Sequence, residues 1–181
     1  MAEWTANWVY EIIPNWAAQS QEHRTRQLWK QGLPPKVRGT VWMLGVGNTL
    51  NVTDELFNIC LKRAKMAFLQ QSSSNSSLGS SGAPTPSTSP PPVNLAGAGE
   101  VGREDTVALI GVDLNRTFPS LGIFQSGGPL YEPLREVLMA YACYRPDIGY
   151  MQGMSFLAAM LLLNMDSKDA FRVHRNAFLI Y

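Results

Sequence analysis

The sequence predicts an all-helical domain that is interrupted by a long disordered insertion. Apolar residues recur at the i, i+3, i+4 spacing of helices along most of the 181 residues. No run alternates apolar and polar residues between hairpin turns, so no strand is predicted. The apolar content of 45% is enough to bury a core on either side of the insertion.

Two helices are predicted before the insertion. The first follows the prolines of Leu33-Pro-Pro35 and ends near Gly47, because prolines favour a helix start and glycine favours a helix end. The second begins at Thr53, whose hydroxyl can cap the helix and which two acids follow. Its apolar positions then continue at helical spacing as far as Phe68.

The insertion is predicted from Ser72 to Gly102. This segment consists mainly of Ser, Pro, Gly, Thr and Ala, with few charges and few large apolar side chains. Such a composition cannot bury enough surface to offset the entropy lost on ordering. The free energy of closing a loop rises only slowly with its length, so the two helices on either side can still pack together.

The first helix after the insertion carries Val107, Ile110 and Leu114 on one side. It is expected to end at about Arg116, because Pro119 restrains the residue before it from helical geometry.

Three further helices are predicted towards the C-terminus. One runs through Leu134 and Tyr141, between Pro129 and the turn that ends at Gly149. Residues 154–163 are apolar on nearly all sides, which predicts a helix buried on every side. Ser167 opens the last helix.

Composition excludes several classes of function. Fifteen Lys and Arg stand against fourteen Asp and Glu, and a formal charge of +1 gives no basic field to bind nucleic acid. Cys60 and Cys143 form no disulfide framework and are interpreted as small buried apolar residues of a reducing compartment. The first residues do not resemble a signal peptide, and no apolar run is long enough for a membrane span, so we expect a soluble intracellular chain. Phosphate-loop, nucleophile-elbow and metal-binding signatures are missing, which disfavours a self-contained hydrolase or a metalloenzyme.

A first polar group ends the helix after the insertion. Successive residues turn by about 100°, so Ile110, Asp113 and Arg116 share one side of that helix. A buried Ile can anchor an Asp that orients the Arg, whose charge is favoured at the helix C-terminus. The alternative is an ordinary surface pair at i, i+3 spacing.

A second polar group leads into the apolar helix over residues 154–163. Tyr150 and Gln152 lie two residues apart, and Gly149 and Gly153 would allow another backbone to come close. The alternative for Gln152 is a polar group at a helix start. A third group, Arg38 and Trp42 at i, i+4 spacing, is a helix packing motif before it is a catalytic one.

These three groups, in this order, resemble the TBC domain family of Rab GTPase-activating proteins. The family carries an Arg-x-x-x-Trp box, an Ile-x-x-Asp-x-x-Arg box and a Tyr-x-Gln box. They correspond here to Arg38–Trp42, Ile110–Arg116 and Tyr150–Gln152. Arg-Thr-Phe-Pro follows the second box and Gly-Met-Ser-Phe follows the third. The run Ala-Tyr-Ala-Cys-Tyr-Arg-Pro-Asp-Ile-Gly is most similar to the branch that contains TBC domain family members 12 and 14.

The resemblance implies a GTPase activator with two catalytic side chains that reach into a Rab in its GTP state. Arg116 would neutralise charge on the transferring phosphoryl group, and Gln152 would position the attacking water. Asp113, Tyr150, Gly153, Arg38 and Trp42 would be supporting residues. No cofactor of the chain itself is implied, because GTP and Mg²⁺ would belong to the GTPase. The chain would be cytoplasmic and would reach membranes, endosomal or autophagic ones, through its partner.

On this resemblance the chain divides into a lead-in (1–31), a first part of the TBC domain (32–71), the insertion (72–102), the catalytic-finger region (103–169) and a divergent end (170–181). Family domains continue through further helices, so a truncated chain is expected. Two functional hypotheses follow: an active accelerator, or a truncated, non-catalytic Rab-binding or scaffold module in membrane traffic. A fragment that is unstable on its own is a third.

Overall fold

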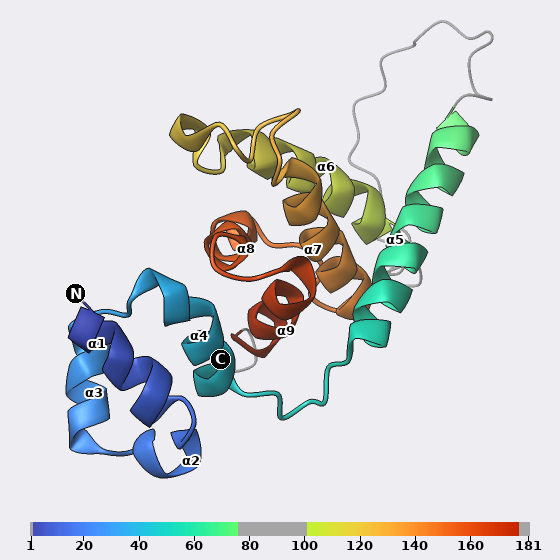
Figure 1. The fold of residues 1–181 in the computed structure, drawn as a ribbon. Helices are drawn as coiled ribbons and strands as arrows, with labels where there is room; N and C mark the ends of the chain where they lie inside the picture. The colour runs from blue at the N-terminus through green and yellow to red at the C-terminus, as the bar shows by residue number, and fades with distance from the viewer. Residues whose placement is uncertain (1, 76–100, 178–181) are drawn as a thin grey trace, which may run out of the picture.

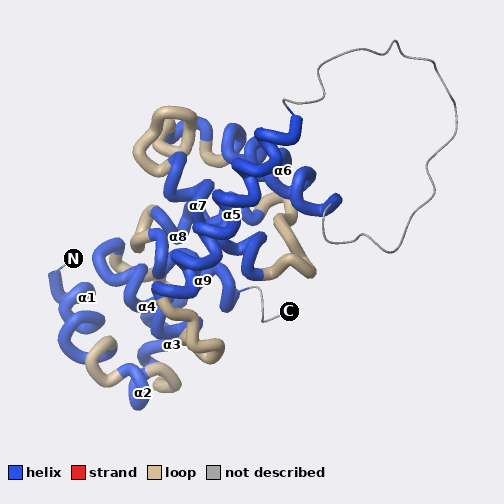
Figure 2. Tube along the Cα trace, turned by 90° about the vertical axis from the view of Figure 1, so that its right-hand side faces the viewer, coloured by secondary structure: helices blue, strands red, loops and turns tan. Residues whose placement is uncertain are grey.

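The computed structural model describes residues 2–75 and 101–177, and within these ranges it contains helices and loops but no strand (Figures 1 and 2). The all-helical prediction is therefore confirmed. No helix in the described ranges is both long and apolar enough to cross a membrane. The helices are α1 (Ala2–Ala6), the π-helix η1 (Asn7–Ile12), α2 (Trp16–Gln19), α3 (His23–Lys30), η2 (Pro35–Val37), α4 (Arg38–Val46), α5 (Asp54–Asn75), α6 (Val101–Arg116), η3 (Pro119–Leu121), α7 (Tyr131–Tyr144), α8 (Met154–Leu162) and α9 (Ser167–Ala177).

The predicted helix ends agree with the observed ones where a cap or a proline sets them. Thr53 accepts a hydrogen bond of 3.3 Å from the Leu56 N–H at the start of α5. Gly47 ends α4 with a positive φ of 70°. Most of the insertion predicted for 72–102 lies outside the described residues. Its first residues, 72–75, complete α5, and residues 101–102 begin α6.

Residues 2–46 form a small helical unit, whereas the sequence predicted only a lead-in over residues 1–31. Its core contains fully buried Trp8, Ile12 and Val41. The rings of Trp8 and Trp16 both contact Trp29, with centroids 6.3 Å and 6.1 Å from it. Tryptophans thus supply much of the packing in this unit.

Helices α5 to α9 enclose a second, larger core. Helix α7 contacts α5, α6, α8 and α9, and it lies between α5 and α8 in Figure 1. Its Leu134, Val137 and Leu138 are fully buried. Cys60 of α5 is buried and Cys143 of α7 half-buried, and both are free thiols.

One prediction about this core is wrong. Helix α8 is not buried on every side: Phe156, Leu157 and Met160 are 37% to 41% exposed. Helices α6, α7 and α9 pack against α8 and cover the side that carries Ala158, Ala159 and Leu162. A uniformly apolar sequence does not reveal how much of a helix surface the neighbouring helices cover.

The two cores meet at α4. Trp42 packs against both of them. Gly39 of α4 lies so close to the turn after α8 that an added Cβ would stand 2.3 Å from the carbonyl oxygen of Asn164. Only glycine can occupy this position without moving the backbone of that turn.

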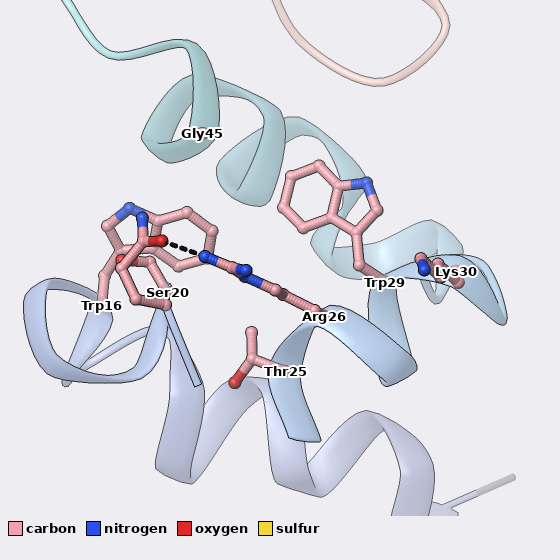
Figure 3. Close-up of a pocket in the computed structure, with 8 residues that line it drawn as sticks. Trp16, Ser20, Thr25, Arg26, Trp29, Lys30 and Gly45 are labelled. Carbon is pink, nitrogen blue, oxygen red and sulfur yellow. Dashed lines mark hydrogen bonds between the residues drawn. The ribbon is translucent and has the colours of Figure 1, made fainter. Parts of the chain in front are cut away.

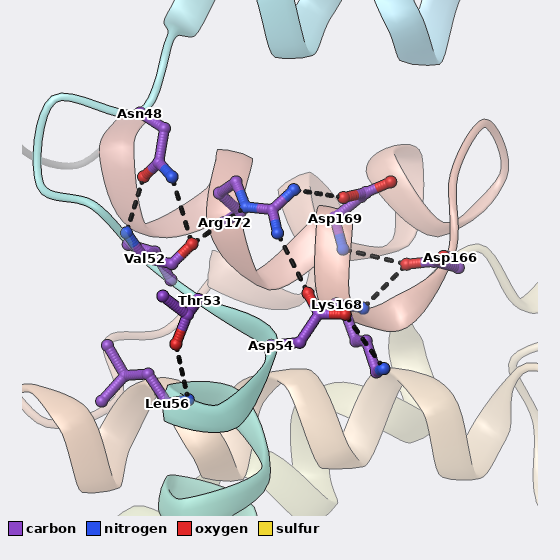
Figure 4. A network of polar contacts seen from close by, with 9 residues as sticks. All are labelled: Asn48, Val52, Thr53, Asp54, Leu56, Asp166, Lys168, Asp169 and Arg172. Atoms are coloured by element: carbon purple, nitrogen blue, oxygen red, sulfur yellow. Dashed lines mark hydrogen bonds and ion pairs between the residues drawn. The ribbon is translucent and has the colours of Figure 1, made fainter.

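A polar network joins the start of α5 to α9 (Figure 4). Asp54 forms ion pairs with Lys168 at 3.1 Å and with Arg172 at 3.0 Å. Arg172 also donates a hydrogen bond to the Val52 carbonyl oxygen at 3.2 Å. Residues 48–52 therefore connect the two cores along a path that α9 holds in place.

Replacing Gly39 with alanine should destabilise the chain by about 1 to 3 kcal/mol, because the new methyl group overlaps backbone atoms that cannot rotate away. Gly111→Ala is the matched control. An alanine Cβ there meets no atom within 4 Å and lies within a helix, so it should stabilise by about 0.5 to 1 kcal/mol. Urea denaturation followed by circular dichroism measures both changes, and an equal effect of the two alanines would contradict the close contact.

Acid should destabilise the fold through His174 of α9. His174 is fully buried with its ring edge-on to Tyr141, at 4.9 Å between centroids. Burial lowers the pKa of His174 to about 4, against the smaller opposing effect of a hydrogen bond to the Met154 backbone. The unfolded chain takes up this proton near pH 6.5, so between pH 6.5 and pH 4 the folded state loses about 3 kcal/mol.

The variant His174→Phe should lack this part of the acid destabilisation, because Phe keeps the aromatic contact and takes up no proton. His23→Phe, at an exposed position, is the matched control. Unfolding free energies measured between pH 4 and pH 7 test the difference. Parallel profiles for the native chain and His174→Phe would rule out the assignment.

Candidate functional site

A buried carboxylate lies where α6 meets the start of α8. Asp113 is 2% exposed, and its Oδ2 accepts hydrogen bonds from the Tyr150 hydroxyl at 2.5 Å and from the Gly153 N–H at 2.9 Å. Its Oδ1 forms an ion pair with Arg116, one turn further along α6. A side chain so deeply buried does not form the ordinary surface pair that the spacing also allowed. Asp113 joins the second and third sequence boxes.

These contacts keep Asp113 ionised. Burial by itself would raise the pKa of the carboxyl, but hydrogen bonds from Tyr150, Gly153 and Arg116 outweigh it and hold the pKa below its usual range. Burial and the bond to Asp113 raise the pKa of Tyr150 to about 12. At neutral pH the pair therefore consists of a carboxylate that accepts and a phenol that donates.

Arg116 and Gln152 contact each other at the surface beside this carboxylate. The Arg116 side chain is 43% exposed, and Gln152 is exposed as well. With the Gln152 amide oriented to satisfy its surroundings, its oxygen accepts hydrogen bonds from both terminal nitrogens of Arg116, at 2.8 Å from Nη1. Arg116 ends α6 and Gln152 lies in the turn before α8, 36 positions further along the chain, and yet they form one cluster.

Helix α6 ends at Arg116 for a local reason. Thr117 leaves the helix, and Phe118 takes a left-handed conformation with φ 42° and ψ 56° before Pro119 opens η3. The left-handed conformation raises the free energy of a non-glycine residue by about 1 to 2 kcal/mol, so the surrounding packing must enforce the turn. The guanidinium thus projects from the last turn of the helix, where cationic charge is favoured.

The two glycines that flank the third box are needed for a different reason from the one expected. We expected Gly149 and Gly153 to let another backbone come close. A Cβ on Gly153 would meet no atom within 4 Å, and one on Gly149 would make only an ordinary contact with Thr106 at 3.4 Å. Both residues have positive φ, 65° and 95°. Glycine is therefore required by the backbone turn that points the Gly153 N–H at Asp113.

The first box lies apart from the cluster. Arg38 donates from Nε to the Leu33 carbonyl oxygen at 3.1 Å, and Trp42 packs between the two cores. Across the described ranges, no hydrogen bond or ion pair links either side chain to Arg116 or Gln152. Their supporting role stays a prediction.

Two buried hydroxyl groups belong to the site and were not singled out from the sequence. Thr117 and Ser155 are fully buried, and their hydroxyl oxygens lie 2.8 Å apart. Both occur in the short runs that follow the second and third boxes, Arg-Thr-Phe-Pro and Gly-Met-Ser-Phe. For Ser155 the available signal was a small polar residue within an apolar run, whereas Thr117 follows Asn115 and Arg116 and has no such signal.

A cavity of about 410 Å³ occurs elsewhere, in the N-terminal unit (Figure 3). Trp16 and Trp29 flank it, and the Arg26 side chain extends between them. None of the predicted site residues lines it. In the described part of the chain, no cluster of three or more His, Cys, Asp or Glu side chains is arranged to hold a metal ion.

The surface cluster offers two kinds of polar chemistry at one point. A guanidinium is permanently charged and can donate several hydrogen bonds in one plane to an anionic group. A primary amide can accept and donate at once, which suits it to orient a water molecule. The buried Asp113 carboxylate fixes the positions from which these two side chains project.

Comparison with known proteins bears on the same region. The family model described as the Rab-GTPase-TBC domain matches residues 99–176, which include Asp113, Arg116, Tyr150 and Gln152. The chain is 50% identical over 169 residues to TBC1 domain family member 14 of Bos taurus and 47% identical to member 12 of Rattus norvegicus. Over residues 99–176 the chain matches the Rab-GTPase-TBC family. Its predicted similarity to the branch of members 12 and 14 is confirmed.

The relatives are longer proteins. Both matches cover 93% of this TBC chain but 22% of the relative. Drainin of Dictyostelium discoideum is 46% identical over 187 residues, which cover 91% of this chain and 42% of Drainin. The family match reaches residue 176 and so includes residues 170–176 of the predicted divergent end.

Removing the Tyr150 hydroxyl should destabilise the TBC chain by about 1 to 3 kcal/mol, because the buried Asp113 carboxylate then lacks one of its donors. Tyr150→Phe keeps the ring and removes the hydroxyl, which also hydrogen-bonds Ser155. Tyr10→Phe is the matched control at an 80% exposed position and should change stability by less than about 0.5 kcal/mol. Chemical denaturation at pH 7 measures both, and similar values would mean that the bond contributes nothing.

Proposed function

We propose that this TBC chain accelerates GTP hydrolysis by a Rab-type small GTPase. The proposal rests chiefly on the surface contact between Arg116 and Gln152, which is supported from below by the buried Asp113 carboxylate. An activator must bring a cation and a water-orienting group to the same bound nucleotide at once. Two such side chains already next to each other suit that task.

Arg116 is the proposed arginine finger. Its guanidinium would lie against the transferring phosphoryl group and neutralise the charge that develops there. An arginine supplied in trans to a GTPase raises the rate by about 10³ to 10⁵, which corresponds to roughly 4 to 7 kcal/mol of barrier. Because Arg116 is exposed and lies at a helix end, a partner can reach it without opening the fold.

Gln152 is the proposed glutamine finger, which would orient the attacking water in place of the GTPase's own glutamine. Its exposed position in the turn that leads into α8 supports this role. To act, its amide must exchange the hydrogen bonds with Arg116 for bonds to the water. GTP and Mg²⁺ would be supplied by the GTPase in its GTP state.

The proposed partner accounts for the setting of the protein. Rab-type GTPases act on membranes of vesicle traffic, so the TBC chain would work in the cytoplasm and reach endosomal or autophagic membranes through the bound Rab. The names of the relatives include the TBC1 domain, and the matching family model is described as the Rab-GTPase-TBC domain, which supports a Rab as the partner class.

Single-turnover GTP hydrolysis by a panel of purified Rabs tests the proposal. The TBC chain should accelerate at least one Rab, and Arg116→Ala should reduce this acceleration by about 10³-fold or more. Gln152→Ala should reduce it strongly as well. Arg116→Lys should not restore it, because an ammonium cannot reproduce the planar set of donors.

Arg24→Ala and Gln27→Ala are the matched controls, since both residues are exposed on α3 in the N-terminal unit. They should leave the acceleration unchanged. A folded chain that binds GTP-loaded Rab without accelerating hydrolysis would replace the proposal with the binding-module hypothesis.

A further inference from the structure

A buried hydrogen bond links the two segments that carry the finger residues. Thr117 follows Arg116 directly, and Ser155 lies in the first turn of α8, three residues after Gln152. Both side chains are fully buried, and a hydrogen bond of 2.8 Å joins their hydroxyl groups. Thr117 and Ser155 thus each lie in the same chain segment as one of the two proposed finger residues.

Thr117 is held in further ways. Its hydroxyl also bonds the Asp113 carbonyl oxygen at 2.6 Å, which satisfies one of the free carbonyls at the end of α6. Its own carbonyl oxygen accepts a hydrogen bond from Gln125 Nε2 at 3.3 Å. Buried hydroxyl groups are costly unless they are paired, so these bonds favour a single arrangement of Thr117.

An aromatic contact follows the same path. Phe118 has the left-handed backbone conformation, and its ring meets Phe156 of α8 edge-on at 5.4 Å between centroids. The residues next to Thr117 and Ser155 therefore pack against each other as well. The end of α6 and the start of α8 are joined by a polar contact and an apolar one.

The surface contacts between Arg116 and Gln152 cannot hold the end of α6 and the start of α8 together during catalysis. Arg116 and Gln152 hydrogen-bond each other in the free chain, and these bonds must break when the two side chains engage a nucleotide and a water. The hydroxyl pair below them is inaccessible to a partner and can stay intact. It can hold the two backbones at a fixed spacing while the exposed contacts are exchanged.

We propose that Thr117 and Ser155 are positioning residues, whose buried hydrogen bond sets the spacing between the Arg116 and Gln152 backbones. This inference rests on the proposed function for its kinetic consequence. A displacement of about 1 Å can cost about 100-fold in rate without weakening binding. Loss of the pair should therefore lower the maximal acceleration rather than the affinity for the GTPase.

The test compares Thr117→Val, which keeps the shape and deletes the hydroxyl, with Thr117→Ser, which keeps the hydroxyl. In single-turnover assays over a range of chain concentrations, Thr117→Val should lower the maximal acceleration about 10- to 100-fold. The concentration for half-maximal acceleration should change less than about threefold. Thr117→Ser should stay within about threefold of the native chain in both quantities, as should Thr40→Val at an exposed position of α4.

Ser155→Ala removes the other partner and should reproduce the effect of Thr117→Val, and the double variant should be little worse than either single one. Circular dichroism melts establish that each variant is folded at the assay temperature. A folded Thr117→Val with native acceleration overturns the inference and leaves the proposed function intact. A native chain that accelerates no Rab overturns the proposed function instead.

A second measurement does not depend on activity. The side-chain amide signals of Gln152 in a ¹⁵N-labelled chain can be assigned by their loss in Gln152→Ala. In Thr117→Val these signals and the Gly153 N–H signal should shift, while the side-chain signals of Gln27 in α3 should not. Unchanged Gln152 and Gly153 signals would overturn the inference even if no Rab responds.

Discussion

The charge on Asp113 constrains the whole site. A carboxylate that is 2% exposed can stay ionised only if donors surround it, and here they come from both segments of the site. Tyr150 and Gly153 approach from the third box and Arg116 from α6. Separating the two segments would leave a buried charge without partners, which is strongly destabilising. The contact between α6 and the segment that leads into α8 is thus maintained by the electrostatic cost of breaking it as much as by apolar packing.

This constraint explains why the exposed part of the site can be polar and still well defined. Arg116 and Gln152 project into solvent, where a hydrogen bond contributes little net free energy. Their backbones are nevertheless fixed, because each is adjacent to a residue bonded deep in the core. In the proposed reaction these two side chains would exchange hydrogen-bond partners while their backbones stay fixed, as preorganised sites require.

Local patterns predicted the fold better than they predicted the site. The end of α6 followed from Pro119, and the start of α5 followed from the capping hydroxyl of Thr53, since both effects act within one turn of helix. The pairing of Asp113 with Arg116 followed from helical geometry. The bond between Tyr150 and Asp113 spans 37 residues and depends on how α6 packs on α8, which no local pattern contains.

The same limit accounts for the failures. The exposed side of α8 depends on which helices lie against it, and a uniformly apolar run looks the same in either case. Gly153 was expected to allow a close approach, whereas its backbone angle is what needs glycine, and the residue type alone does not separate these two causes. The assignment of Arg116 and Gln152 as finger residues stays a prediction, which came from the family resemblance rather than from the local chemistry of one sequence.

The distribution of tryptophan has a consequence for spectroscopy. All five tryptophans of the chain, Trp4, Trp8, Trp16, Trp29 and Trp42, lie in the N-terminal unit or at its junction with the second core. Indole emission therefore reports on the N-terminal unit and its junction, while the ellipticity of α5 to α9 dominates the far-ultraviolet signal. The N-terminal unit thus carries a built-in optical label, so the order in which it and the second core unfold on heating can be followed without attaching a dye.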